Sequence, residues 1–559
     1  MMLSYSIIIN AVLLSSNLFS GYYVEATSLR GIDAIHRTAH RTLEDDQIAL
    51  YLLKEIEMGN TAVLDANADL PQDGKSSYRT DNIQLLDGTI YEVKNAQTGW
   101  ADNLVSGTDS VRIPPGAIIS SDGTIDMNGQ PLTTVPDRNL HEDLADRDAH
   151  RSDRNRMLQI GTKTVLAVRV ILDDGAYSYA SQTGLSDDVF GDKVDPSNLK
   201  SQYAACSYDQ LIFNKALDRS MTTNPNDGTT AISSGVVDVK VDFGVAAGDL
   251  VIRNEVTNKI NAVFGVSNPD QLANYVMYCM PPGVMSGIAY AYVNSWNSVY
   301  SNEWCNFLST QVHEVRCSVV NAIPSQLTLS PFCAFTIRSG ITLDLLTRTS
   351  FTDDQSCIMG YSYSQDDSPL MCFNAAKSWQ SKWYTSKSKV VDPSAGTDNC
   401  FLGNVYGIAD YGNAAATTVL VKIDDASATD YYVAFNRKIG INSGTQEAGN
   451  QVTVVKVGGE GNSYAESELL AKLSSGGSWS GIVDGKNMTV KVLSINTGST
   501  PAYAYVRISE AGTLCGGPPD PTIPPCLAPG APVTCTNTVN PNCCSGSCIK
   551  RGKKQNTCV

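Results

Sequence analysis

The sequence predicts an α/β domain, followed by an antiparallel β-sandwich and a small disulfide-rich tail. A run of apolar residues at 165–171 and the alternating Val237, Val239 and Val241 indicate that a sheet begins near residue 162. After about residue 394, helical spacing gives way to short alternating strands separated by Gly, Asn and Ser turns, which is typical of a sandwich. The Pro-rich end of the chain then holds seven cysteines between Cys515 and Cys558.

Length and composition indicate a globular protein with several domains. A chain of 559 residues is too long for one hydrophobic core. Apolar residues make up 42% and charged residues 18%, which is the balance of a folded chain rather than a disordered one. The formal net charge of -16 argues against a nucleic-acid partner, because phosphate binding needs clustered Lys and Arg.

Residues 1–26 have the features of a secretory signal peptide. An apolar run at 7–14 is too short to span a bilayer, and Val24-Glu25-Ala26 is a small-residue pattern suited to signal peptidase. No Lys or Arg precedes the run, so an uncleaved anchor is the alternative. Fifteen cysteines favour an oxidising destination, and Asn487-Met488-Thr489 makes Asn487 a glycosylation candidate. We therefore expect a secreted, extracellular protein with no later membrane span.

Residues 27–156 are predicted to be a propeptide. They contain no cysteine and four of the five histidines, and they end in four arginines interleaved with Asp and Ser. Arg151-Ser152-Asp153-Arg154 offers a processing protease a basic cleavage site. The alternative is a solvated linker with ordinary charge alternation. Since this region has no cysteine, it cannot supply a thiolate that caps a metal.

The α/β domain is expected to contain a helix that presents a His-Glu pair beside its buried face. Helical spacing occurs at 199–213, strands are predicted at 273–280 and 288–293, and a further helix is predicted from about residue 302. In that last helix, four apolar side chains lie on one face, namely Trp304, Leu308, Val312 and Val315. The strand at 288–293 is a candidate edge along which an extended peptide could pair.

Strands dominate the sandwich region, and cysteines dominate the tail. The predicted strands are 419–423, 431–435, 452–457, 488–495 and 503–508, and the only predicted helix lies near 466–473. The tail resembles a small cystine-knot module that disulfides would stabilise, with candidate cysteines Cys526, Cys535, Cys543, Cys544, Cys548 and Cys558. Six cysteines allow fifteen pairings, so the connectivity stays open.

His313-Glu314 and Met359 are the residues that carry a chemical hypothesis. A zinc peptidase needs three protein ligands, an open position for water and a carboxylate base, and a helical His-Glu-x-x-His supplies two of the ligands and the base. Taken alone, a His-Glu pair is as well explained by a histidine on a helix surface. Downstream, Met359-Gly360-Tyr361 resembles the Met-turn beneath the zinc site of metzincins, although an ordinary core methionine is the alternative.

Taken together, several segments resemble the gametolysin family, which are secreted metzincins that degrade cell walls. The segments are 278–283, 288–296, 304–306, 311–315, 359–362 and 371–379, and more loosely 430–437. The resemblance implies a metzincin-like metallopeptidase domain at 157–395 with a mixed twisted sheet and an active-site helix. The β-sandwich would then occupy 396–514 and the knottin-like tail 515–559. The resemblance also implies a zymogen whose substrate is an extracellular matrix or cell-wall protein.

The same resemblance implies a role for each site residue. Zinc would be the cofactor and His313 its first ligand, while Glu314 would be the general base on a zinc-bound water. Tyr361 would assist the oxyanion, and Met359 would be the structural residue of the Met-turn. Six cysteines of the family-like region are even in number and are expected to form three disulfides, namely Cys206, Cys279, Cys305, Cys357, Cys372 and Cys400. Cys515 is left over beside the six tail cysteines and would pair elsewhere or with another chain.

The chain departs from the family in the second half of the zinc motif. The family has His-Glu-x-x-His-x-x-Gly-x-x-His, whereas here Cys317 stands at the second position and the later Gly and His are absent. A Cys317 thiolate lies one turn from His313 and is a possible second ligand. No residue obviously replaces the third ligand. As written, the chain would be an inactive pseudoprotease that serves as an extracellular binding module.

A retained intron or a frame error in 316–350 is our preferred explanation of this departure. The family resemblance stops abruptly after Val315 and resumes at Asp353. Codon degeneracy permits residues 340–350, read two nucleotides later, to encode His-Asn-Leu-Gly-Leu-Ala-His-Ser-Asn-Glu. That is the missing half of the motif at the correct spacing. The hypothesis predicts that the transcript does not translate 316–350 in this frame.

Overall fold

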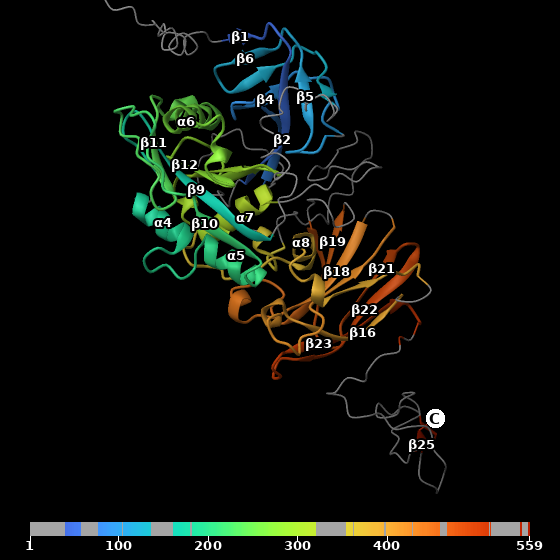
Figure 1. Ribbon diagram of the computed structural model, residues 1–559. Helices are drawn as coiled ribbons and strands as arrows, with labels where there is room; N and C mark the ends of the chain where they lie inside the picture. Colours follow the sequence, from blue (N-terminus) through green and yellow to red (C-terminus); the bar gives the residue numbers. More distant parts are fainter. Residues whose placement is uncertain are drawn as a thin grey trace, which may run out of the picture.

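The computed structural model describes thirteen stretches of the chain. They are residues 40–57, 77–102, 104–135, 160–178, 181–319, 354–360, 363–395, 399–426, 429–458, 467–513, 515, 548–549 and 557–558. The architecture is mixed α/β, with large sheets and few helices (Figure 1). The signal-peptide residues, Arg151 to Arg154 and most of 316–350 lie outside the described residues. No helix among the described residues is long and apolar enough to cross a membrane.

The described part of the predicted propeptide is a strand-rich unit with its own core. Its strands are β1 (His40–Thr42), β2 (Gln47–Glu57), β3 (Ser77–Gln84), β4 (Ile90–Lys94), β5 (Ser110–Ile113), β6 (Ile118–Ser120), β7 (Thr124–Asp126) and β8 (Thr133–Val135). One hydrophobic cluster lies wholly between Leu43 and Leu132, and it includes Val111 and Ile125. We call this unit, residues 40–135, the N-terminal domain.

The next unit is built on a mostly parallel sheet. Its strands are β9 (Gly161–Ile171), β10 (Leu211–Lys215), β11 (Val236–Lys240), β12 (Tyr275–Met280), β13 (Ala289–Tyr292) and β14 (Asn297–Ser301). The strands are ordered β13-β14-β12-β9, and both β10 and β11 pair with the far edge of β9. All pairs among these strands are parallel except β13 with β14. The strands predicted at 165–171, 237–241, 273–280 and 288–293 are confirmed.

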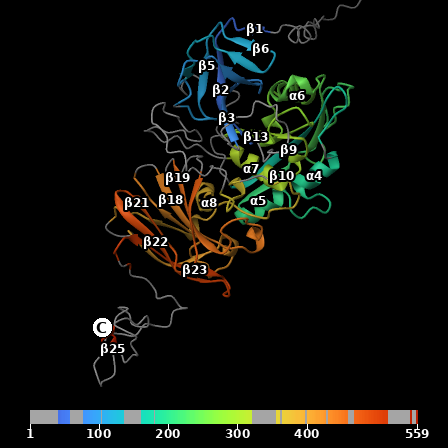
Figure 2. The ribbon, with the colours of Figure 1, turned by 180° about the vertical axis from the view of Figure 1, so that it is seen from behind.

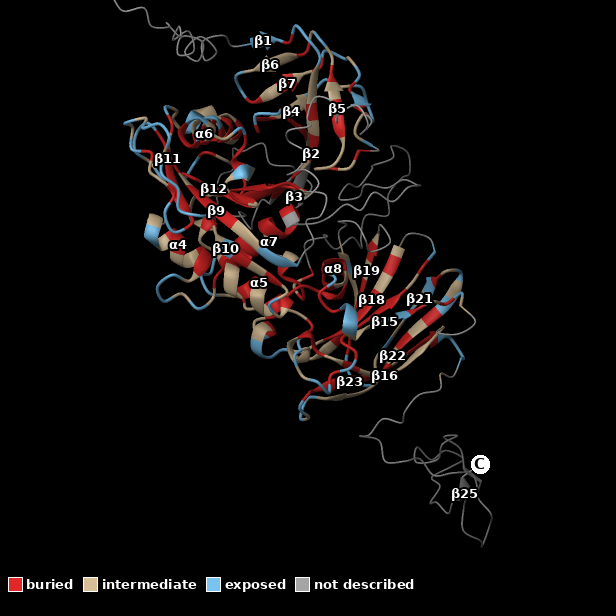
Figure 3. Ribbon diagram, viewed as in Figure 1, coloured by how far each residue is buried: buried red, intermediate tan, exposed pale blue. Residues whose placement is uncertain are grey.

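Helices cover both faces of this sheet, as expected for parallel strands. The helices are α4 (Gln182–Phe190), α5 (Leu199–Ser207), α6 (Asp249–Phe264), α7 (Leu308–Val319) and α8 (Ala375–Ser381). One core cluster joins residues of α4, α5, α7 and α8 to one face, and a second joins α6 to the other. In Figure 3, β12 is buried along its length, and β9 is buried in its middle.

Short 3-10 turns connect several of these elements. They are η2 (Val245–Ala247), η3 (Pro269–Gln271), η4 (Asn302–Cys305), η5 (Ile358–Gly360), η6 (Thr385–Lys387), η7 (Ile408–Asp410) and η8 (Gly440–Asn442). The helix predicted from residue 302 therefore begins as the turn η4, and α7 itself starts at Leu308. Leu308, Val312 and Val315 are buried and Trp304 is half-buried, so the predicted apolar face is confirmed.

The helix predicted at 199–213 is wrong in its second half. A capping box at Asn198 starts α5, which ends at Tyr208 in the left-handed conformation with φ 53°. Leu211 and Phe213 then alternate with less buried residues on β10, which pairs with β9. Two short apolar stretches in succession imitate helical spacing, because periodicity cannot separate a short strand from a helix.

Two sheets form the C-terminal unit. The five-stranded sheet is ordered β15 (Ser388–Val391), β17 (Leu420–Ile423), β18 (Thr429–Asn436), β19 (Gln451–Gly458) and β20 (Ser467–Leu473). The four-stranded sheet is ordered β16 (Phe401–Tyr406), β23 (Tyr503–Glu510), β22 (Lys486–Asn496) and β21 (Ser478–Val483). Residues of both sheets belong to one hydrophobic cluster, which includes Val421, Val454, Val490 and Val506. The five strands predicted in this region are confirmed.

The helix predicted near 466–473 is wrong, because those residues form β20. This strand pairs with β19, and the register shifts between Val454 and Val455. Across the shift, Leu469 packs against one core cluster and Leu470 against another. The irregularity breaks the strict alternation that would otherwise have marked the segment as a strand.

Three disulfides join described residues. Cys206 bonds to Cys372 and Cys279 to Cys305, as the even cysteine count of the family-like region suggested. Cys400 instead bonds to Cys515, the cysteine that was left over, and Cys357 keeps a buried free thiol. The expectation of three bridges within the family-like region is therefore wrong, because Cys400 pairs with a cysteine that follows β23.

Little of the tail is described. Strand β24 (Cys548–Ile549) pairs with β25 (Thr557–Cys558), which places Cys548 opposite Cys558. Cys526, Cys535, Cys543 and Cys544 lie outside the described residues, so the disulfide framework of the tail stays a prediction.

Candidate functional site around helix α7

Helix α7 is fixed against the sheet by its apolar face and by hydrogen bonds to its backbone. Tyr203 from α5 donates its hydroxyl to the carbonyl of Val312 at 3.0 Å. The side chain of Gln311 reaches back to the carbonyl of Cys305 at 2.8 Å. At the other end, the backbone N–H of Asn294, just after β13, donates to the carbonyl of Cys317 at 3.1 Å. The helix is thus held at both ends.

The His-Glu pair lies in the middle of α7, and its two side chains differ in exposure. His313 is half-buried, whereas Glu314 is only 2% exposed. Burial, and after it the charge of Glu314, raises the pKa of the Tyr300 phenol on β14 well above its ordinary value. Glu314 is thus on the buried side of α7, the helix that contacts β13 and β14.

The Met359 turn lies beside α7. Met359 is the middle residue of η5 and packs, half-buried, against the same core cluster as α7. Ile358 donates its N–H to the carbonyl of Cys372 at 3.2 Å, and Gly360 donates to the carbonyl of Cys357 at 2.9 Å. Asp354, which starts the turn, accepts from the Asn374 side chain at 2.8 Å.

The chain beyond this turn returns to α7. The Ser309 hydroxyl accepts from the backbone N–H of Tyr363 at 2.7 Å and donates to the carbonyl of the same residue at 3.0 Å. Tyr361, which the resemblance placed near the metal, lies outside the described residues. The structure thus brings His313, Glu314 and the Met359 turn into one region.

Arg316 and Cys317, the first residues of the segment 316–350, are packed inside the fold. Arg316 is fully buried, donates to the carbonyl of Lys377 at 3.0 Å, and lies with its guanidinium 5.2 Å from the ring of Phe373 and 6.0 Å from that of Trp383. Such contacts offset part of the cost of burying a charge. Cys317, also fully buried, follows on the same turn.

A catalytic zinc does not fit the described side chains. Such a site takes three protein ligands and an open position. Within the stretches that the structure describes, no group of three His, Cys, Asp or Glu side chains is placed to hold a metal ion. His313 and Cys317 lie one turn apart on α7, and the positions where the family motif has its glycine and third histidine fall in 320–350, outside those stretches.

Strand β13 borders this region, and the N-terminal domain covers its free edge. Strands β13 and β2 are antiparallel, with Tyr292 opposite Lys54 and Tyr290 opposite Ile56 (Figure 2). The sequence suggested β13 as an edge for an extended peptide, and the structure places β2 there. The continuous apolar run at 48–53 is consistent with a strand, but nothing in it identifies β13 as the neighbour of β2.

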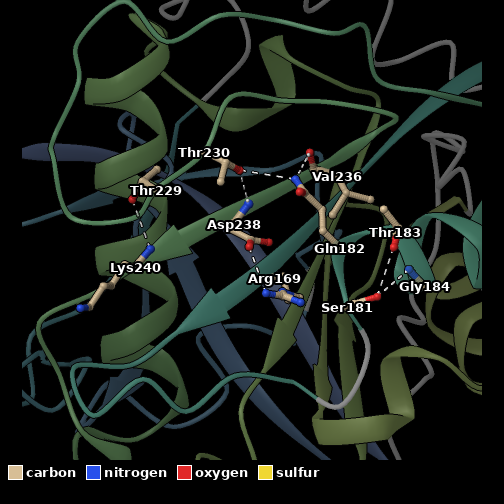
Figure 4. Close-up of polar contacts among 10 residues, drawn as sticks. All are labelled: Arg169, Ser181, Gln182, Thr183, Gly184, Thr229, Thr230, Val236, Asp238 and Lys240. Atoms are coloured by element: carbon tan, nitrogen blue, oxygen red, sulfur yellow. Dashed lines mark hydrogen bonds and ion pairs between the residues drawn. The ribbon is translucent and has the colours of Figure 1, made fainter.

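A second polar cluster, shown in Figure 4, has a structural role. Arg169 on β9 donates to Asp238 on β11 at 3.0 Å, and both side chains are nearly buried. Thr230 accepts from the Asp238 backbone N–H at 3.0 Å and from the Gln182 side chain at 3.4 Å. These bonds join two parallel strands to α4 and the loop before β11, so the cluster holds the sheet together.

Asn487 is exposed on β22, opposite Ile482 on β21. An exposed position is what attachment of a glycan requires, and the proposal of glycosylation there stands on the sequon.

No protein-family model, no curated protein and no solved structure matches this chain.

Proposed function

We propose that this chain is built on the scaffold of a secreted zinc metalloendopeptidase of the gametolysin kind, acting on proteins of an extracellular matrix or cell wall. The observation that carries the proposal is the arrangement of the sheet. Strands β14, β12 and β9 are parallel, β10 and β11 continue them on the far side of β9, and β13 is antiparallel at the other side. A helix with His313-Glu314 follows β14. A metzincin places its cleft between such an edge strand and such a helix. In this proposal Glu314 is the proton acceptor and His313 the first metal ligand.

Two further arrangements support the proposal. The Met359 turn packs beside α7, where a Met-turn would support the site from below. The five-stranded and four-stranded sheets share one hydrophobic cluster, which supports our inference that they pack as a β-sandwich. The buried disulfide between Cys206 and Cys372 and the cysteine-rich tail fit a secreted protein.

The metal ligands that α7 offers favour a second candidate function, that of a binding module without hydrolysis. Among the described residues, α7 offers His313 and Cys317 but no third partner for a metal, and Arg316 is packed as an ordinary core residue. The chain as written is then a binding module, in which the edge of β13 still holds an extended peptide although no hydrolysis follows.

Sequencing of the RNA across codons 312–356 tests the first candidate against the second. If the transcript joins Val315 to the frame that supplies two further histidines, the purified product should bind one zinc per chain and cleave extracellular glycoproteins. Glu314→Gln should then abolish cleavage while zinc stays bound, and Glu303→Gln, at a half-buried Glu before α7, should leave it intact. If the complete-motif protein binds zinc but cleaves no protein substrate, the peptidase proposal is wrong.

A further inference from the structure

We propose that the edge of β13, together with Tyr290 and Asp249, is a docking site for an extended peptide that carries a lysine or arginine. We further propose that β2 is the built-in occupant of this site. The inference rests on the peptide-binding part of the proposed function and does not require hydrolysis. Its ligand class is an antiparallel strand with a basic side chain between two apolar ones.

The backbone of β2 fills the edge of β13 in the way an added strand would. Four residue pairs are in register from Ala289 with Glu57 to Tyr292 with Lys54. The pairing continues one step further, where Val293 donates its N–H to the carbonyl of Leu53 at 2.9 Å. Main-chain bonds of this kind give a docked peptide affinity without regard to its sequence.

Lys54 supplies the sequence-specific part of the contact. It is 5% exposed, its ammonium lies 3.2 Å from the Asp249 carboxylate, and it stands 3.8 Å from the centroid of the Tyr290 ring. A buried ammonium is costly unless a carboxylate and an aromatic face compensate it. Asp249 is the first residue of α6, so carboxylate and ring both belong to the α/β unit, while the cation belongs to the N-terminal domain.

The neighbours of Lys54 on the same face of β2 complete the recognition pattern. Leu52 and Ile56 are buried in the core cluster that α6 shares with the sheet. Side chains two residues apart point to the same face of a strand, so a peptide in this register presents apolar, basic and apolar groups to that face. The pattern read from β2 is Leu-x-Lys-x-Ile.

The N-terminal domain has a hydrophobic core of its own, from which we infer that it keeps its fold when it leaves this edge. Its core cluster is self-contained, and only a few of its apolar side chains, including Leu52, Ile56 and Ile90, enter the core of the α/β unit. Polar contacts also join the two units beside β13: the Ser106 hydroxyl donates to the carbonyl of Val293 at 2.6 Å, and the Asn294 amide donates to the carbonyl of Ser106 at 3.1 Å.

Gly107 offers a way to displace β2 from the full-length chain. A Cβ on Gly107 would lie 1.9 Å from the carbonyl oxygen of Asn294, just beyond β13, and the residue has φ +71°. Gly129 has nearly the same backbone conformation, φ +74°, but no atom lies within 4 Å of its Cβ position. Gly107→Val therefore adds a clash between the units, and Gly129→Val adds the same local strain without one.

The probe is a fluorescent peptide with the sequence of residues 47–57, compared with a version that has norleucine in place of Lys54. Binding to full-length chains is followed by fluorescence polarisation. We expect Gly107→Val to bind the lysine peptide at least about 10-fold more tightly than the Gly129→Val chain, because the internal competitor is displaced. The norleucine peptide should bind about 30-fold more weakly than the lysine peptide, since it lacks the charge contacts.

Asp249→Asn in the Gly107→Val chain should remove the preference for lysine over norleucine. Should Gly107→Val fail to fold, Lys54→Met in the full chain weakens the same internal competitor, and Lys94→Met, at an exposed ion pair, is its control. Equal binding of the two peptides, or a lysine preference that survives Asp249→Asn, would overturn the inference. Cleavage of substrates without any lysine preference overturns this inference alone, whereas lysine-selective binding by a complete-motif chain that never cleaves overturns only the peptidase proposal.

Discussion

The side-chain amide of Asn254 on α6 pairs with the backbone of Ile90 on β4 as a neighbouring strand would. Ile90 donates its N–H to the Asn254 carbonyl oxygen at 2.9 Å, and the Asn254 amide donates to the Ile90 carbonyl at 2.8 Å. Next to it, Arg253 donates to the carbonyl of Gly88 at 3.0 Å. Two successive residues of α6 thus hold the backbone where β4 begins, one at Gly88 in the turn and one at Ile90 in the strand.

Asn254→Leu should loosen this junction between α6 and the N-terminal domain. The substitution keeps the volume but leaves two buried backbone groups of Ile90 without partners, which should cost about 3 kcal/mol of stability. The check is the midpoint of chemical denaturation, with hydrogen exchange at Ile90 as the local measure. Gln97→Leu, at an exposed amide of the same domain, is the control. An unchanged midpoint and unchanged exchange at Ile90 would contradict the expectation.

Gly360→Ala should disrupt the Met359 turn. A Cβ at this position would lie 2.0 Å from the carbonyl oxygen of Asp354, so the backbone of the turn must move. We expect a loss of about 3 kcal/mol, in the upper part of the range for overpacking. Gly458→Ala is the matched control, because nothing lies within 4 Å of its Cβ position. Equal thermal midpoints for the two variants would mean that the turn is not tightly packed.

Asp188 on α4 should make the protein less stable as the pH rises toward neutrality. Burial raises the pKa of its carboxyl from 3.8 to about 7, and Asp366 and Asp195 add to the effect. The folded state therefore holds the proton more tightly than the unfolded state, so stability is greatest in acid and falls as the pH rises from about 4 to about 7.

Asp188→Asn should remove much of this dependence of stability on pH and raise the thermal midpoint at pH 8. Melting curves between pH 5 and 8 measure both effects. Asp45→Asn, at an exposed aspartate, should leave the slope as it is. A slope that is the same in wild type and Asp188→Asn would show that this carboxyl is ionised in the fold.

Cys357 should resist alkylation in the native protein. Burial raises the pKa of its thiol from 9.0 to about 12, and the nearby Asp354 carboxylate adds to the rise. The thiolate is the reactive form, so iodoacetamide at pH 8 should leave Cys357 unmodified until the chain is unfolded, as peptide mapping by mass spectrometry would show. Because its pKa is raised on folding, its contribution to stability is lost as the pH rises from about 9 to about 12. Rapid labelling at pH 8 under native conditions would contradict this placement.

Where the sequence pattern was strong and local, prediction and structure agree. The apolar run in β9, the alternating valines of β11 and the apolar face of α7 all follow from periodicities that the chain carries within a few residues. The errors at 199–213 and 466–473 arose where a short strand carried helix-like spacing. In both segments, pairing with a neighbouring strand decided the structure.

The sequence by itself determined the strands β9, β11, β12 and β13, five strands of the C-terminal unit, and the position of His313-Glu314 on a helix after an aromatic strand. Only the tertiary structure decided that β2 covers the edge of β13 and that Lys54 meets Asp249, 195 residues further along the chain. Periodicity is a local property that shows which face of a segment is buried. The neighbour that buries it is chosen by register, shape and charge between segments far apart in the chain, and these become definite only when the chain is folded.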